Sequence, residues 1–180
     1  MLSLKSKITQ AVLGYFMLHE GQELYVNEIA RRLTLDQGNL DRKLKELEKD
    51  GILKSELRGK ERYYSLNPSF PLFKEYKKII LKTVGLEHVL KKAFQSVKRL
   101  KQAYLFGSYA KDQMDLASDI DLLAVGNHDT LELQKKISEI QKSIGREINV
   151  VSFGPAEYEK KRKKDPFVKS VLQGKKIQIV

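Results

Sequence analysis

Two aspartates, two positions apart, are the residues in this sequence best suited to carry chemistry. Asp119 and Asp121 open the apolar run "DIDLLAV". Successive side chains of a strand point to opposite faces, so a strand here places both carboxylates close together on one face. Like charges in that position destabilise a buried strand, or one of them keeps its proton, unless a cation pairs with both. Because Mg²⁺ takes carboxylate oxygens as ligands, the pair predicts a Mg²⁺ site.

A glycine–serine pair ends another apolar run, "KQAYLF", upstream of the aspartates. Gly107 allows a close backbone approach, and a turn at Gly107 and Ser108 leaves backbone N–H groups free to bind phosphate oxygens. Ten residues lie between Ser108 and Asp119. A phosphate-binding turn and a metal-binding strand this close in sequence predict a site for a metal-bound triphosphate.

Strand-like and helical runs alternate around these residues. Two amphipathic helical stretches come first, "LFKEYKKIILKTV" and "LEHVLKKAFQSVKRL". Four strand-like runs follow, "KQAYLF", "DIDLLAV", "REINVVSF" and "KKIQIV", and the long stretches between the last three are helical. This alternation predicts a mixed α/β sheet covered by helices.

Upstream of Pro68 the pattern is different. Apolar residues at helical spacing predict three helices, with their apolar positions at Ile8, Val12, Leu13, Phe16 and Met17, then Val26, Ile29, Ala30 and Leu33, then Leu40, Leu44 and Leu47. The third helix has cap-type residues at its start and Gly51 after its end. The alternating runs "ILKSEL" and "ERYYSL" flank Arg58-Gly59-Lys60 and predict a hairpin with a basic turn.

This order of elements, carried by "NEIARRLTLDQGNLDRKLKELEKDGILKSELRGKERYYSLN", resembles the winged helix-turn-helix domain of ArsR-like repressors. The resemblance implies that the helix from Asp36 to Asp50 lies in a DNA major groove and that the hairpin meets phosphates. The implied DNA-binding residues are Gln37, Asn39, Arg42 and Lys43 on the helix, and Arg58, Lys60 and Arg62 on the wing. Use of the same domain as a protein-interaction module stays open.

The second half, with "GSYAKDQ" followed by "SDIDLL", resembles the polymerase-β-type nucleotidyltransferase superfamily in its minimal form. The resemblance implies two Mg²⁺ ions held by Asp119 and Asp121, which bridge a nucleoside triphosphate. It also implies that Gly107 and Ser108 bind the phosphates, with Lys111 as a further phosphate contact.

Two positions depart from the family's pattern. The third carboxylate, on the next strand, aligns with Asn149, which cannot accept a proton. Glu147 lies two residues earlier on the same strand face and is the candidate substitute. Asp112 stands where a glycine is usual and adds negative charge beside the phosphate turn. Asp119, Asp121, Glu147 and Asn149 are therefore the candidate catalytic residues, and activity stays open.

Composition sets the remaining limits. The chain of 180 residues has no cysteine, which excludes disulfides and thiolate metal sites, and no apolar run of membrane-spanning length, so we expect a cytoplasmic protein. Its net charge of +11 favours a polyanionic partner, and residues 71–100 alone carry eight Lys and Arg against two acids. A run of basic residues, Lys160 to Lys164, is either a solvated helical face or a surface that attracts nucleic acid or triphosphate.

The sequence thus predicts an α+β, mixed α/β protein in which an all-α winged-helix domain with a small β-wing (residues 1–68) is joined by a basic linker helix (69–85) to a small mixed-sheet nucleotidyltransferase domain (86–180). The predicted function is Mg²⁺-dependent transfer of a nucleoside monophosphate from a nucleoside triphosphate, directed to double-stranded DNA or to a protein partner. The alternatives are a transcriptional regulator whose transferase fold only senses nucleotide or holds a partner, and an antitoxin-like interaction module. The winged-helix resemblance implies a homodimer.

Overall fold

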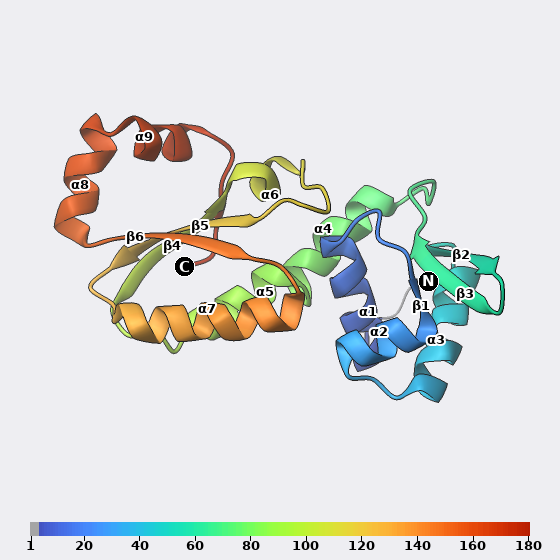
Figure 1. The fold of residues 1–180 in the computed structure, drawn as a ribbon. Helices are drawn as coiled ribbons and strands as arrows, with labels where there is room; N and C mark the ends of the chain where they lie inside the picture. Colours follow the sequence, from blue (N-terminus) through green and yellow to red (C-terminus); the bar gives the residue numbers. More distant parts are fainter. Residues whose placement is uncertain (1–3) are drawn as a thin grey trace. The chain divides into compact units, whose positions relative to one another are not determined.

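The computed structural model describes residues 4–180 (Figure 1), and the chain divides into two compact units, with the boundary between His88 and Val89. Each unit has its own sheet and its own buried core. Among the described residues, no helix has both the length and the apolar character needed to cross a membrane.

Among the described residues, the first unit is built on four helices and a three-stranded antiparallel sheet. Its elements are α1 (Lys7–Leu18), β1 (Leu24–Tyr25), α2 (Val26–Leu33), α3 (Gln37–Lys49), β2 (Leu53–Arg58), β3 (Glu61–Leu66) and α4 (Phe73–Thr83). Most of the predicted apolar positions form its core, where Phe16, Ile29 and Leu44 are fully buried, while Ile8, Val26, Ala30 and Leu33 are half-buried. The sheet order is β1-β3-β2, so the hairpin of β2 and β3 gains a short third strand. The predicted winged-helix arrangement is confirmed.

Helix α3, the predicted DNA-reading helix, begins where the sequence indicates. The Asp36 carboxylate accepts a hydrogen bond from the backbone N–H of Asn39 at 2.9 Å and caps the first turn. Gly51 follows the last turn with a φ of +81°, in the left-handed region where glycine ends a helix at least cost.

The segment predicted as a linker lies in the first unit, where α4 packs against α1. Lys77 on α4 donates a hydrogen bond to the Glu20 carboxylate at 2.7 Å. Helix α5 (Leu86–Phe94) crosses the boundary between the units. The predicted domain limits at residues 68 and 85 stay a prediction.

The second unit is a four-stranded sheet with helices on both faces. Its elements after α5 are β4 (Leu100–Phe106), α6 (Gly107–Lys111), β5 (Ile120–Gly126), α7 (Thr130–Ile144), β6 (Ile148–Phe153), α8 (Pro155–Lys164), α9 (Pro166–Gln173) and β7 (Ile177–Gln178). The order is β6-β5-β4-β7, with β5 and β6 parallel and the other pairs antiparallel. The predicted mixed sheet is confirmed.

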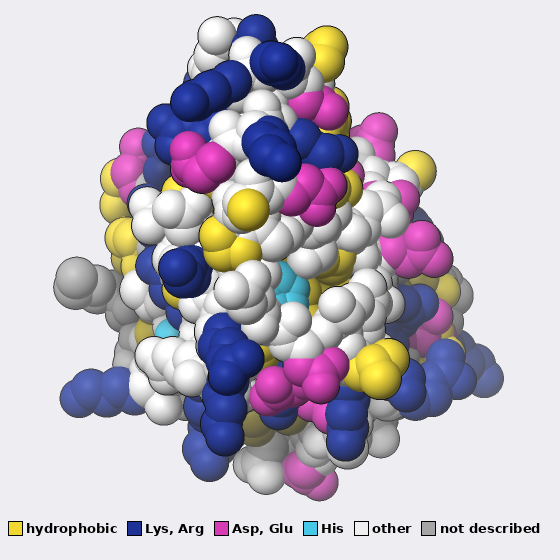
Figure 2. Space-filling view, turned by 90° about the vertical axis from the view of Figure 1, so that its left-hand side faces the viewer, with side chains coloured by type: hydrophobic (Ala, Val, Ile, Leu, Met, Phe, Trp, Pro, Cys, Tyr) yellow, Lys and Arg dark blue, Asp and Glu magenta, His cyan; other side chains and the backbone are white. Residues whose placement is uncertain are grey.

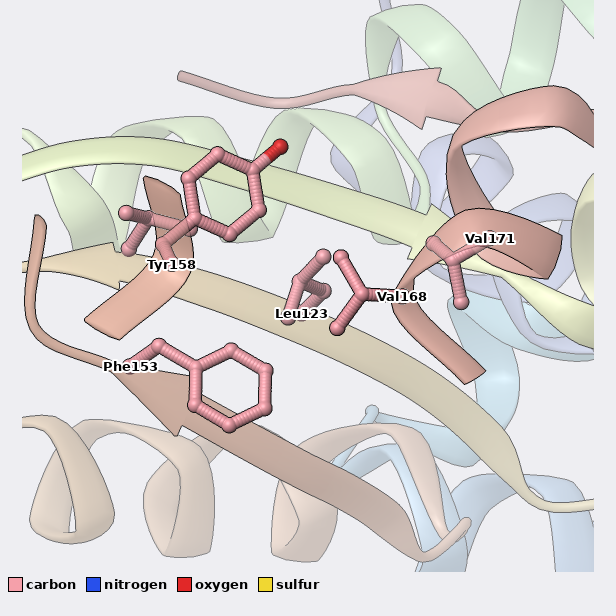
Figure 3. Close-up of a cluster of buried hydrophobic side chains, with 6 residues drawn as sticks. Leu123, Phe153, Tyr158, Val168 and Val171 are labelled. Carbon is pink, nitrogen blue, oxygen red and sulfur yellow. The ribbon is translucent and has the colours of Figure 1, made fainter. Parts of the chain in front are cut away.

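The two faces of this sheet are covered by different helices. In Figure 1, α5 and α7 lie on one side and α8 and α9 on the other. On the second side, Leu123 of β5 and Phe153 of β6 pack with Tyr158, Val168 and Val171 of the two helices (Figure 3). Burial on both faces explains why β5 is apolar throughout after Asp121.

The helical stretch after β6 is two helices. Asp165 has extended backbone (φ −76°, ψ 122°), and its carboxylate accepts a hydrogen bond from the Val168 N–H at 3.0 Å. Pro166 follows as the first residue of α9. The residue before a proline is disfavoured in helical geometry, so α8 ends there and α9 starts in a new direction.

Candidate active site

Asp119 and Asp121 lie at the start of β5, one of the two central strands of the second unit's sheet. Asp119 is the last loop residue before the strand and is exposed, while Asp121 is half-buried. Alternation along β5 puts Asp121 on the face of Leu123, which α8 and α9 cover. The aspartates therefore occupy the end of that face beyond the apolar cluster.

The glycine of the predicted phosphate-binding turn contacts the second aspartate directly. Phe106, the last residue of β4, pairs with Asp121 of β5, so the next residue, Gly107, comes over the carboxylate. A Cβ atom on Gly107 would lie 2.1 Å from Asp121 Oδ2, and the φ of Gly107 is +68°. Contact distance and backbone angle both require glycine here.

The other residues of the predicted phosphate turn belong to the short helix α6. Gly107 and Ser108 form its first turn, and Lys111 is exposed at its last. Asp112, which departs from the family pattern, ends the helix with a φ of +56°. An aspartate tolerates this left-handed conformation better than most residues, which accounts for its presence where glycine is usual.

Asn149 of β6 lies beside the aspartates. It is in register with Asp121 across the parallel pair of β5 and β6, and its Nδ2 donates a hydrogen bond to Asp119 Oδ2 at 3.3 Å. Glu147 precedes β6, and its backbone carbonyl accepts a hydrogen bond from Ile120 N at 3.0 Å. The side chain of Glu147 is exposed. Asn149 therefore contacts the aspartates through its side chain, whereas Glu147 contacts β5 through its main chain.

The electrostatics of the pair favour a cation. Burial, and then the charge of Asp119, raise the pKa of Asp121 above the ordinary value of an aspartate. Within residues 4–180, no group of three or more His, Cys, Asp or Glu side chains gathers as a metal site. Two carboxylates and the Asn149 amide oxygen are nevertheless a donor set that fits Mg²⁺, which keeps several water ligands when it binds to proteins.

Arg146 braces the loop before Asp119, and the sequence pattern did not reveal it. Its side chain is 8% exposed, and it donates hydrogen bonds to the carbonyls of Ser118 (2.5 Å) and Asp115 (2.9 Å). The loop is also closed internally, because Asp115 Oδ1 accepts hydrogen bonds from Ser118 Oγ at 2.7 Å and from the Ala117 N–H at 3.0 Å. These hydrogen bonds lower the pKa of Asp115, and the one from the Ser118 side chain has the largest effect. Arg146 thereby fixes the chain that enters β5.

In the first unit, the predicted reading residues of α3 are mostly open to solvent. Gln37, Asn39 and Arg42 are exposed. Gln37 donates a hydrogen bond to Asn27 of α2 at 2.5 Å, and Lys43 is ion-paired with Glu46 one turn along. Arg42 takes part in no ion pair with any residue in 4–180.

The wing residues are less free than the sequence pattern indicates. Arg58 is ion-paired with Glu23 at 2.6 Å and Glu56 at 2.5 Å, and lies 5.1 Å from the Tyr63 ring centroid. Arg62 donates a hydrogen bond to Ser55 Oγ at 2.9 Å. Lys60 is exposed in the turn, and the described part of the chain offers it no ion pair.

Comparison with known families matches both halves of the chain. The sequence model described as nucleotidyltransferase domain matches residues 88–179. The model described as bacterial regulatory protein, arsR family, matches residues 16–55. A comparison with curated protein sequences found no match.

Three solved structures are similar to parts of the chain. HlyU from Vibrio cholerae N16961 is 22% identical over 44% of this chain and 80% of its own, with a TM-score of 0.37. A mutant MntA–HpeT toxin–antitoxin is 15% identical over 53% of this chain and 73% of its own, with a TM-score of 0.41. A toxin–antitoxin with AMP-PNP is 18% identical over 52% of this chain and 72% of its own, with a TM-score of 0.40.

Proposed function

The chain belongs to the nucleotidyltransferase domain family, and on that premise we propose that it transfers a nucleoside monophosphate from a nucleoside triphosphate to a hydroxyl group. The observation that carries this proposal is the contact of Gly107 with Asp121, beside Asp119. It joins the predicted phosphate-binding turn to a pair of carboxylates. A site of that composition suits a triphosphate held with Mg²⁺.

Each residue of the site has a role in this proposal. Backbone N–H groups of Gly107 and Ser108 bind terminal phosphate oxygens, and Lys111 adds a positive charge nearby. Asp119 and Asp121 would hold Mg²⁺, which supplies neutralisation of phosphate charge when bound. Asn149 orients Asp119 through its amide and can offer its carbonyl oxygen as a neutral ligand.

The proposed transfer is a single displacement at the α-phosphorus. The acceptor oxygen forms a bond to that phosphorus, the bond from phosphorus to the oxygen that bridges to the β-phosphate breaks, and pyrophosphate leaves. The acceptor's proton goes to Glu147 or to solvent, since Asn149 cannot take it. The rate of transfer therefore depends on whether Glu147 reaches the acceptor.

Incubation with α-labelled nucleoside triphosphates and Mg²⁺ tests the proposal. We expect label to appear covalently on a macromolecule or small hydroxyl compound from a cell extract, with release of pyrophosphate. Label from the γ-phosphate should not be transferred. Transfer of γ-label in its place would identify a phosphotransferase and exclude the proposed reaction.

A specific observation also favours a second function, in which the transferase fold only senses nucleotide. Asn149 lies in register with Asp121, where the family's third carboxylate is expected, and it donates a hydrogen bond to Asp119. A site so arranged can bind a metal and a triphosphate without a base beside the acceptor. The chain would then be a transcriptional regulator, or an antitoxin-like module that holds a protein partner.

For the first unit we propose binding to double-stranded DNA, as a homodimer, with α3 in the major groove. Because Arg58 is held by two carboxylates and Lys60 is paired with no carboxylate of residues 4–180, we expect Lys60→Gln to weaken duplex binding more than Arg58→Gln. Each lost phosphate contact should reduce the slope of log affinity against log salt by about 0.9. Arg42→Gln should instead change the preferred sequence.

Fluorescence anisotropy with a labelled duplex at several salt concentrations measures these effects. The charge-matched control is Lys49→Gln, at the far end of α3 from the reading residues. Equal salt slopes for the parent and Lys60→Gln would exclude the wing from the DNA contact, and salt-independent duplex affinity would favour the interaction-module alternative.

A further inference from the structure

Helix α8 carries five consecutive basic residues, of which two already have partners. Lys161 is 3.4 Å from the Glu157 carboxylate, and its Nζ lies 4.6 Å from the centroid of the Phe153 ring. Arg162 donates a hydrogen bond to Glu159 at 2.9 Å. These two cations are part of the helix's own packing and charge balance.

The other three, Lys160, Lys163 and Lys164, are exposed. Residues at spacings of three and four lie on one side of a helix, so the three ammonium groups share a face of α8. Among the described residues, none of the three takes part in an ion pair. Figure 2 shows Lys and Arg side chains gathered at the top of the view, over α8, with acidic side chains among them.

An exposed aromatic ring follows these lysines on the next helix. Phe167 of α9 is 41% exposed, although it is a large apolar residue. Its ring packs edge-on against Phe106, with 5.7 Å between the ring centroids. Asp165 and Pro166 separate it from α8, and the Asp165 carboxylate is occupied in capping α9. The ring is held by Phe106 on one side and open to solvent on another.

Phe167 also lies next to the candidate active site. Phe106, which it contacts, precedes Gly107 in the chain and pairs with Asp121 across the sheet. Helices α8 and α9, which carry the three lysines and the exposed ring, thus cover the same face of the sheet as Asp121. A ligand that reaches the Phe167 ring would lie near the strand pair that carries Asp121.

We propose that the α8–α9 surface, defined as Lys160, Lys163, Lys164 and Phe167, binds single-stranded nucleic acid. The lysines meet successive phosphates, and an unstacked base lies on the Phe167 ring. Single-strand binding proteins combine these two elements, a row of cations along the backbone and an aromatic platform for bases. An acidic peptide would use the lysines but not the ring, and the bases of a duplex are stacked away from it.

This surface belongs to the second unit, whereas the winged helix belongs to the first. The proposal does not rest on catalysis, and a binding measurement alone tests it. The test uses the full chain and a fluorescent oligouridine of twelve nucleotides, with anisotropy measured at several salt concentrations. All variants carry Arg42→Gln and Lys60→Gln, so that two of the proposed DNA contacts of the first unit are removed from the comparison.

Two variants separate the roles of charge and ring. Lys163→Gln with Lys164→Gln should reduce the salt slope by about 1.4, since each phosphate contact of a single strand contributes about 0.7. Phe167→Ala should weaken binding roughly 5- to 160-fold, the range that base stacking on an aromatic residue provides, and leave the salt slope unchanged. Phe167→Leu keeps an apolar side chain against Phe106 and should lose nearly as much affinity.

Lys135→Gln with Lys142→Gln is the control, because it removes the same charge from exposed positions of α7, on the other side of the sheet. The proposal is overturned if this control weakens binding as much as the α8 variant does. It is also overturned if both Phe167 variants bind the oligonucleotide like the parent, which would mark the surface as a general polyanion site, or if a duplex binds there as tightly as the single strand.

Discussion

Replacing Asp119 and Asp121 together by asparagine is expected to abolish Mg²⁺-dependent binding of a nucleoside triphosphate. With Mg²⁺ and the triphosphate present, the parent should unfold at a higher temperature. Its free energy of unfolding should rise by about 2.7 kcal/mol when the ligand is at 100 times its Kd. The variant should gain nothing, because amides replace the two anionic groups in the donor set. Isothermal titration calorimetry and thermal unfolding with a non-hydrolysable triphosphate measure both quantities.

The control for this prediction is Glu132→Gln with Glu139→Gln, which removes two negative charges from α7, on the opposite side of the sheet. It should bind metal and triphosphate like the parent. If the aspartate variant also binds like the parent, the site has been assigned to the wrong residues.

The pH dependence of metal binding provides a second readout of the same pair. Burial and Asp119 raise the pKa of Asp121, so a proton competes with the metal at a higher pH than for an ordinary aspartate. As pH falls, Asp121 should take up its proton before an ordinary aspartate does, and Mg²⁺ affinity should decline as it does so. A decline only in the range of unperturbed aspartate would mean that the two carboxylates do not act as a pair.

The core of this site could be predicted because local sequence rules decide it. Strand alternation places Asp119 and Asp121 on one face, and an antiparallel pair between β4 and β5 necessarily brings the end of one strand to the start of the other. Gly107 follows β4 and so meets Asp121. The same reasoning applies to Asn149, since β5 and β6 are parallel strands joined by the helix α7.

No such local rule predicts the contacts between segments that are distant in the sequence. Arg146 reaches carbonyls 28 and 31 residues earlier in the chain, and only the packed fold reveals that it is nearly buried. Arg58 has the charge of a phosphate-binding wing residue, but the carboxylate of Glu23 lies 2.6 Å away. The sequence shows that a cation is present, and the neighbours that neutralise it become known only from the structure.

Asn149→Asp is expected to raise the rate of transfer if this protein is a nucleotide-binding relic. In the parent, the Asn149 amide donates to Asp119 at 3.3 Å, so an aspartate there would place a third carboxylate at the same position. It would supply an anionic metal ligand and a proton acceptor beside the acceptor hydroxyl. General bases contribute typically ~10²- to 10⁴-fold, and single-turnover transfer to one acceptor, measured for both proteins, gives the ratio.

Glu147→Gln distinguishes the active enzyme from the relic. Glu147 is exposed and enters from before the start of β6, so it would have to turn toward Asp119 when substrate binds. If the parent is already fast and Glu147→Gln slows it by a similar factor, Glu147 is the base, and the nucleotide-sensor alternative should be dropped. If the parent is inert, binds triphosphate through Asp119 and Asp121, and gains transfer only with Asn149→Asp, then the loss of one carboxylate converted a transferase site into a nucleotide-binding one.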